Sequence, residues 1–91
     1  MGKTLKKYLL FDLDTTALKE EFGPKRYTVA YSMIRQFLEN CGFEHKQGSG
    51  YLSTEPISLN QTIAIYQAMT EEMPWLDSCS KTMDGGNVRG F

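Results

Sequence analysis

The chain has 91 residues, which is enough for one small domain and excludes a second one. A content of 41% hydrophobic and 12% aromatic residues is that of a globular protein and excludes a disordered chain. Ten basic and eleven acidic residues give a net charge of −1, so no overall positive charge attracts nucleic acid. No apolar run approaches the length of about eighteen residues that a membrane span needs, and no secretory leader is recognisable, so we expect a cytoplasmic protein without membrane contact.

The first expected element is a strand from Tyr8 to Leu13, because this run is almost wholly apolar. Gly23 and Pro24 then interrupt the chain, and Pro24 suits the first turn of a helix. A helix is expected from there to Gly42, with apolar residues at three- and four-residue spacing. Its apolar face consists of Ala30, Met33, Ile34, Phe37, Leu38 and Cys41.

Two short strands, 43–47 and 51–54, flank a Gly-Ser-Gly connection at 48–50, which predicts a hairpin. Ser58 and Gln61 form a capping-box pattern that predicts the start of a second helix, interrupted at Pro74. The apolar stripe of this helix consists of Leu59, Ile63, Tyr66, Met69 and Met73.

The Gly85-Gly86 pair predicts a turn into a last strand that stops early, at Phe91. The order of elements is therefore strand, helix, strand, strand, helix, strand. This βαββαβ order predicts a single α+β domain over residues 1–91 with a ferredoxin-like fold, in which both helices cover one face of an antiparallel sheet. The unfinished last strand leaves a sheet edge that a second subunit could cover, so we expect a homodimer.

Residues 12–16 read Asp-Leu-Asp-Thr-Thr and satisfy the D-x-D-x-T pattern of haloacid-dehalogenase-like phosphatases. The chain is too short for the doubly wound sheet of those enzymes, and no later acidic pair completes their metal site, so we reject this interpretation. We expect Asp14 to form a turn with Thr15 and Thr16 through side-chain-to-backbone hydrogen bonds. Asp12 is the one charged group in an apolar strand, where burial without a partner is costly and raises a carboxyl pKa, so it is a candidate functional residue.

Several short segments have the order and separation found in one family of small bacterial proteins. These segments are Phe11-Asp12-Leu13, Ala30-Tyr31, Arg35-Gln36, Gly42-Phe43, Gln47-Gly48-Ser49 with Tyr51, and Arg89-Gly90-Phe91. Together they resemble the VapD (virulence-associated protein D) family over roughly residues 9–91. The resemblance implies a ferredoxin-like homodimer similar to the small CRISPR-associated nuclease-like proteins. It also implies endoribonuclease activity, which in some members belongs to the toxin of a toxin–antitoxin pair.

The resemblance makes Asp12 the candidate catalytic residue, since the matching aspartates of the two subunits approach each other across the dimer axis. Paired carboxylates could bind a metal ion, for which Mg²⁺ is a candidate, or one could act as a general base on a ribose 2′-hydroxyl. The sequence leaves both open. Arg89 could clamp a phosphate or form a structural ion pair with Asp12.

Four further residues are candidates for contact with RNA. Tyr31 on the first helix could stack on a base, pack at a subunit interface, or simply pack on the helix surface or in the core. Gln47, Ser49 and Tyr51 flank the hairpin glycines and could bind phosphates, or could simply build the hairpin. His45 has no visible partner in the sequence, so we expect a histidine on a surface strand.

Two departures from the family pattern bear on activity. Asn87 stands where the family usually has an aspartate, which removes one general base or metal ligand. Family members also continue beyond the residue that matches Phe91, so we expect a truncated form or a dimer that is closed differently.

The main hypothesis is an endoribonuclease of the VapD type that acts on RNA as a homodimer, with an antitoxin protein as a further partner. The alternative is a catalytically silent homodimer that binds nucleic acid or an antitoxin. An unrelated ferredoxin-like regulatory domain is the third hypothesis.

Overall fold

The computed structural model describes residues 5–46 and 50–88. Its elements in chain order are β1 (Lys7–Leu13), α1 (Thr15–Phe22), α2 (Val29–Asn40), β2 (Phe43–His45), β3 (Gly50–Ser53), α3 (Leu59–Glu72), α4 (Trp75–Cys79) and β4 (Ser80–Asn87). The strands form one antiparallel sheet in the order β2-β3-β1-β4. This arrangement confirms the expected α+β class, and its strand order is compatible with a ferredoxin-like fold.

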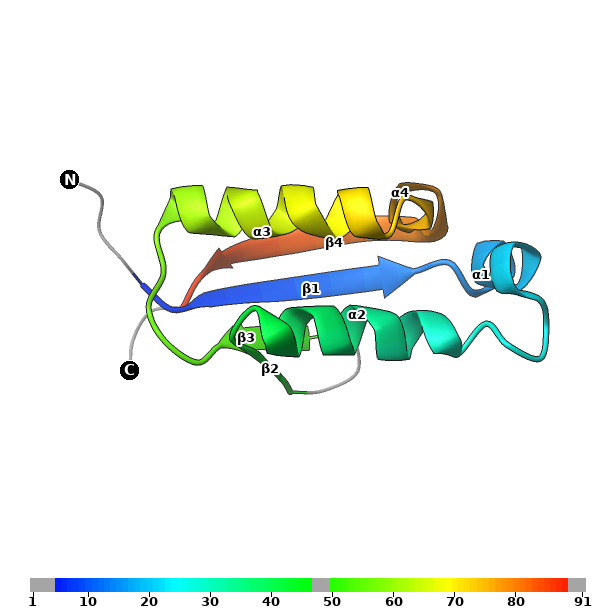
Figure 1. Cartoon of the computed structure of the whole chain (residues 1–91), viewed down its shortest axis with the longest axis horizontal. Coiled ribbons are helices and arrows are strands. Elements are labelled where there is room, and N and C mark those ends of the chain that lie inside the picture. Colours follow the sequence, from blue (N-terminus) through cyan, green and yellow to red (C-terminus); the bar gives the residue numbers. More distant parts are fainter. Residues whose placement is uncertain (1–4, 47–49, 89–91) are drawn as a thin grey trace.

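Helices α2 and α3 lie side by side on one face of the sheet, and α1 and α4 lie together at the end where β1 finishes (Figure 1). Alternate residues of β1 explain why one face is covered, since Leu9, Phe11 and Leu13 are buried while Leu10 and Asp12 are exposed. None of the helices in the described part of the chain covers the opposite face. The sheet therefore has one helix-covered face and one open face.

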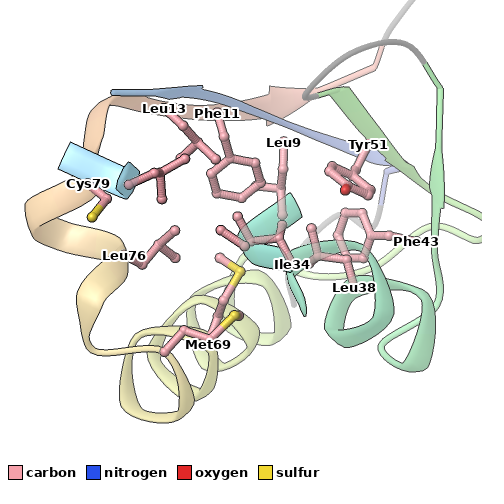
Figure 2. Close-up of a cluster of buried hydrophobic side chains, with 13 residues drawn as sticks. Leu9, Phe11, Leu13, Ile34, Leu38, Phe43, Tyr51, Met69, Leu76 and Cys79 are labelled. Carbon is pink, nitrogen blue, oxygen red and sulfur yellow. The ribbon is translucent and has the colours of Figure 1, made fainter. Parts of the chain in front are cut away.

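The core lies between the sheet and the helices (Figure 2). Leu9, Phe11 and Leu13 point from β1 toward side chains of α2, α3 and α4. Leu38 of α2 and Leu76 of α4 are fully buried at opposite ends of this layer. Burial of such a side chain contributes about 1.5–3 kcal/mol to folding, so this single layer is the main source of stability.

The structure differs from the prediction at residues 14–22, where α1 replaces the expected turn. Oδ1 of Asp14 accepts hydrogen bonds from the backbone N–H groups of Thr16 (3.0 Å) and Ala17 (3.2 Å). Such bonds can form a turn, but here they cap the N-terminus of a helix. Leu18 then enters the core, and the ring of Phe22 meets the ring of Trp75 edge-on with 5.0 Å between centroids.

The first expected helix is confirmed as α2, but it begins at Val29, and Pro24 lies in the turn that precedes it. Gly42 follows the helix with a φ of +88°, a left-handed conformation that favours glycine, which agrees with its expected role as the helix stop.

The capping box of α3 is confirmed. Ser58 Oγ accepts a hydrogen bond from the backbone N–H of Gln61 (3.1 Å), and Gln61 Oε1 accepts one from the N–H of Ser58 (2.8 Å). The expected apolar stripe of α3 is only partly buried: Met69 lies in the core, whereas Leu59 and Ile63 are 66% and 45% exposed.

The expected hairpin is confirmed as β2 and β3, although its tip, residues 47–49, lies outside the described residues. The expected turn at Gly85-Gly86 is wrong, because both glycines lie within β4, opposite Leu9 and Tyr8. A Cβ at Gly85 would lie 2.9 Å from Leu9 Cδ2, and one at Gly86 would lie 2.9 Å from the Tyr8 ring. The glycines thus allow β1 side chains to approach the β4 backbone closely.

No helix within residues 5–46 and 50–88 has the length and apolar character needed to cross a membrane.

Candidate functional site

Asp12 is the penultimate residue of β1, as the sequence predicts. Its partner across the ladder is Thr82 of β4, and the register shifts directly after this pair. The expected burial of the carboxylate is wrong for the single chain, since Asp12 lies on the open face of the sheet and is exposed. The reason is the strand's alternation, which turns Phe11 and Leu13 toward the helices and Asp12 away from them.

A second acid and an exposed leucine lie next to Asp12 on the open face. Leu10 is 47% exposed, although it belongs to a central strand. Its partner across the ladder is Asp84, so Asp84 is the diagonal neighbour of Asp12, a separation of about 7–8 Å in such a sheet. Sequence reasoning missed Asp84, because the expected turn at Gly85 hid its place in a strand.

The described residues hold no group of three or more His, Cys, Asp or Glu side chains that could bind a metal ion. Asp12 and Asp84 supply two carboxylates to the open face, and oxygen ligands of this kind are what Mg²⁺ prefers. A complete set of ligands would need groups from a second subunit, from water or from a substrate phosphate. This fits the usual binding of Mg²⁺ through one or two carboxylates.

Asp14, the second acid of the D-x-D-x-T pattern, has a structural role. Its carboxylate already accepts two backbone hydrogen bonds at the start of α1. This capping explains the spacing of the motif without a phosphatase site and agrees with the rejection of that interpretation.

On the helix-covered face, the structure brings Tyr31 and Tyr51 together in a pocket of about 220 Å³. We call it the aromatic pocket; its lining residues are Phe11, Leu13, Tyr31, Ser32, Ile34, Arg35, His45 and Tyr51. Phe11 and Leu13 stand on either side of Asp12 in β1. The pocket therefore backs onto the strand segment that carries Asp12 on the opposite face.

Tyr51 makes the ring contacts of the aromatic pocket. Its ring meets Phe11 edge-on with centroids 6.1 Å apart, and it lies 5.1 Å from the imidazole of His45. Burial raises the pKa of the Tyr51 hydroxyl; the Arg35 guanidinium opposes this rise and the Glu39 carboxylate adds to it. The Tyr51 hydroxyl thus lies in the field of the ion pair between Arg35 Nε and Glu39 Oε2, which are 3.2 Å apart.

Arg35 and His45 are pocket residues that sequence reasoning missed. Arg35 follows Tyr31 by four positions on α2, and this spacing, which puts both on one helix face, could have revealed it. His45 is half-buried and directed toward Tyr51, whereas a surface position was expected.

The other candidates from the sequence, Gln47, Ser49 and Arg89, lie outside the described residues.

Asn87 lies at the other end of β1 from Asp12. Its Oδ1 accepts a hydrogen bond from Nζ of Lys7, and the two residues are partners across the ladder. Asp12 lies five positions after Lys7, a distance of about 17 Å along a strand. Within one subunit, an acid at position 87 would therefore contact Lys7 and not the carboxylate of Asp12.

The protein is thus a small α+β domain with a single antiparallel sheet, and it carries an exposed acid, Asp12, at the end of β1. Its sequence is 37% identical over 71 residues to the Endoribonuclease VapD homolog of Helicobacter pylori, covering 78% of this chain and 73% of the relative. It is 35% identical over 86 residues to the Endoribonuclease VapD of the same organism, covering 91% and 87%. It is 30% identical over 73 residues to Endoribonuclease VapD 2 of Riemerella anatipestifer, covering 80% and 78%.

No family model matches the sequence. The relatives nonetheless reach 30–37% identity over most of both lengths, and on this basis the chain belongs to the VapD family. The resemblance expected from short segments of the sequence is thereby confirmed.

Proposed function

We propose that the protein is an endoribonuclease that cleaves RNA as a homodimer, with Asp12 as its catalytic residue. The observation that carries the proposal is the similarity to relatives named endoribonucleases. This similarity extends over 73–87% of the length of the three relatives compared above. The position of Asp12 supports it, because an exposed carboxylate at the end of a rigid strand can reach a substrate.

The chemistry proposed for Asp12 follows from its surroundings on the open face. As a carboxylate, Asp12 can act as the general base that removes the proton of a ribose 2′-hydroxyl. Together with Asp84 it can also hold Mg²⁺, which would supply charge stabilisation for the phosphate or an activated water. The two routes make different predictions, since only the second is lost when a chelator removes the metal.

A homodimer formed through the open face would unite two copies of this site. Leu10 is an exposed leucine in the middle of a central strand, two residues from Asp12, and apolar surface of this kind favours association. In a two-fold dimer the same patch meets itself, so Leu10 would pack near its own copy and bring both Asp12 carboxylates to the interface.

The RNA contacts expected from the sequence remain part of this proposal: Tyr31 and Tyr51 in the aromatic pocket, together with Gln47, Ser49 and Arg89. An antitoxin partner and a cytoplasmic location also belong to it. Asn87 in place of an acid is one of the arguments for the catalytically silent alternative, beside the early stop and the near-neutral net charge. Because Asn87 is bonded to Lys7, its identity gives little reason to expect an inactive site around Asp12.

The experiment that tests the proposed function is a gel assay with an end-labelled single-stranded RNA that contains all four bases. We expect cleavage at internal positions at micromolar protein. A parallel reaction with chelator decides between the metal-dependent and metal-independent routes. Intact RNA after prolonged incubation, with and without added Mg²⁺, would contradict the proposal.

A further inference from the structure

The aromatic pocket has no part in the chemistry proposed for Asp12, yet it is built from groups that recognise nucleobases. We propose that this pocket binds one unstacked base of the single-stranded RNA substrate. The inference rests on the proposed endoribonuclease function and adds a base-recognition site on the helix-covered face.

The size and lining of the pocket favour a single flat, partly apolar group. A volume of about 220 Å³ lies below the roughly 300–1,000 Å³ of pockets that take drug-sized ligands. Three aromatic side chains and an imidazole line it, and RNA-binding proteins stack unpaired bases on such rings. Tyr31 lines the pocket and is 37% exposed, so part of its side chain is accessible to a ligand.

The polar groups of the pocket can recognise the edge of a base. Tyr51 is 5% exposed, and its hydroxyl has no hydrogen-bond partner among the described residues. Buried tyrosine hydroxyls usually have a partner. Tyr51 lines the aromatic pocket, so the edge of a bound base could supply this partner.

Arg35 adds positive charge beside this hydroxyl. Its Nε donates to Glu39 Oε2, which leaves the other donors of the guanidinium for a base edge or the adjoining phosphate. The Arg35 side chain is about half exposed, so these donors are open to a ligand. A group that combines a flat base with a phosphate matches this combination of rings and guanidinium better than an apolar peptide side chain does.

Strand β1 connects the pocket to Asp12. Its described pairs with β3 are Tyr8, Leu9 and Leu10, and the segment 11–13 continues beyond them to the end of β1. Phe11 and Leu13 face the pocket from this segment, and Asp12 lies between them. A base held in the pocket would therefore bring the neighbouring phosphodiester to the end of β1 that carries the catalytic carboxylate.

The test measures binding without cleavage. A fluorescently labelled 2′-O-methyl RNA oligomer is titrated with full-length protein in the presence of chelator and followed by anisotropy, beside an abasic oligomer of the same length. The methyl group blocks attack by the 2′-hydroxyl, and the chelator blocks the metal-dependent route. We expect Tyr31→Ala to weaken binding of the base-bearing oligomer about tenfold, the usual contribution of one stacked base. Tyr51→Phe, which keeps the ring, should weaken it about fivefold through the lost hydrogen bond.

Leu59→Ala is the control, because Leu59 is 66% exposed on α3 and is not among the residues that line the pocket. The control should bind as the parent does, and the abasic oligomer should bind the parent as weakly as the base-bearing oligomer binds Tyr31→Ala. Equal binding of both oligomers by the parent, no binding of either, or unchanged binding by the two tyrosine variants would overturn the inference.

Cleavage assays on the same variants separate the two proposals. If the protein cleaves RNA but the pocket variants bind RNA as the parent does, the proposed endoribonuclease function stands and the proposed base-binding role of the pocket is wrong. If RNA binding depends on the pocket but no RNA is cleaved, the base-binding role of the pocket stands and the proposed endoribonuclease function is wrong. If both are correct, Tyr31→Ala should raise KM by about the same factor as it raises the dissociation constant.

Discussion

Lys7 donates a hydrogen bond from Nζ to Oδ1 of Asn87 across the ladder between β1 and β4. Lys7 is only 5% exposed, and its backbone N–H donates to Ser53 Oγ at 2.8 Å. A charged amine in this position needs a polar partner, because burying it alone is costly. Asn87 is therefore part of the structure that holds this end of the sheet together.

Replacement of Asn87 by aspartate should strengthen this contact. The variant Asn87→Asp turns the hydrogen bond to Lys7 into an ion pair and should raise the free energy of unfolding by up to about 1 kcal/mol, as measured by urea denaturation. In a Lys7→Met background the same change should give no gain. Greater cleavage of RNA by Asn87→Asp would instead assign position 87 to an active site completed by the second subunit.

The exposed Leu10 provides a test of the dimer. Leu10→Glu places a charge at the centre of the proposed two-fold interface and should raise the dimer dissociation constant about tenfold or more, measured by sedimentation or light scattering. Leu59→Glu is the control, since Leu59 is 66% exposed on α3 and outside the open face. A dimer equally stable in both variants, or a monomeric parent at high micromolar concentration, would contradict the proposed interface.

The two glycines of β4 should respond differently to alanine. At Gly85 a Cβ meets Leu9 Cδ2 at 2.9 Å and the carbonyl oxygen of Tyr8 at 3.1 Å, so Gly85→Ala should destabilise by about 1–3 kcal/mol. At Gly86 the Cβ meets only the outer atoms of the half-buried Tyr8 ring, which can rotate away. Thermal unfolding should therefore show a clearly larger loss for Gly85→Ala, and equal losses would argue against this register of β4.

The raised pKa of Tyr51 makes stability depend on pH in the alkaline range. Since the folded state holds the proton more tightly than the unfolded state, the stabilisation is complete below the unfolded value near 10 and is lost as pH rises through the folded pKa. NMR of the tyrosine ring carbons should show a late titration of Tyr51. Arg35→Gln should raise the pKa of Tyr51 further, and Glu39→Gln should lower it. Shifts in the opposite directions would contradict the position of the Tyr51 hydroxyl beside this ion pair.

Much of the fold follows from local sequence signals. The apolar run of β1, the stripe of α2 with Gly42 behind it, and the capping box at Ser58 each predict an element that the structure contains. These signals are reliable because they are local: each one stabilises its own strand or helix independently of the tertiary contacts. The short helix α1 had a weaker signal, since Asp14 can start either a turn or a helix and only the burial of Leu18 decides between them.

The site was harder to predict, because it depends on which residues meet in space. The exposure of Asp12 could not be read from an apolar strand, since it depends on all helices covering the same face of the sheet. Likewise, the pair Gly85-Gly86 resembles a turn in the sequence. Only the structure shows that the side chains of Leu9 and Tyr8 occupy the space where Cβ atoms at these positions would lie. Arg35 and His45 join Tyr51 only through the packing of α2 against the hairpin.

The most direct test of the account compares RNA cleavage by the parent with cleavage by Asp12→Asn at equal dimer concentration. Because Asp12 is exposed, its amide isostere should change the free energy of unfolding by less than about 0.5 kcal/mol, so folding and dimerisation serve as internal controls. We predict that Asp12→Asn loses at least about 99% of the cleavage rate, since an amide is neither a general base nor a charged metal ligand. Cleavage by Asp12→Asn at the parent's rate would contradict the central claim.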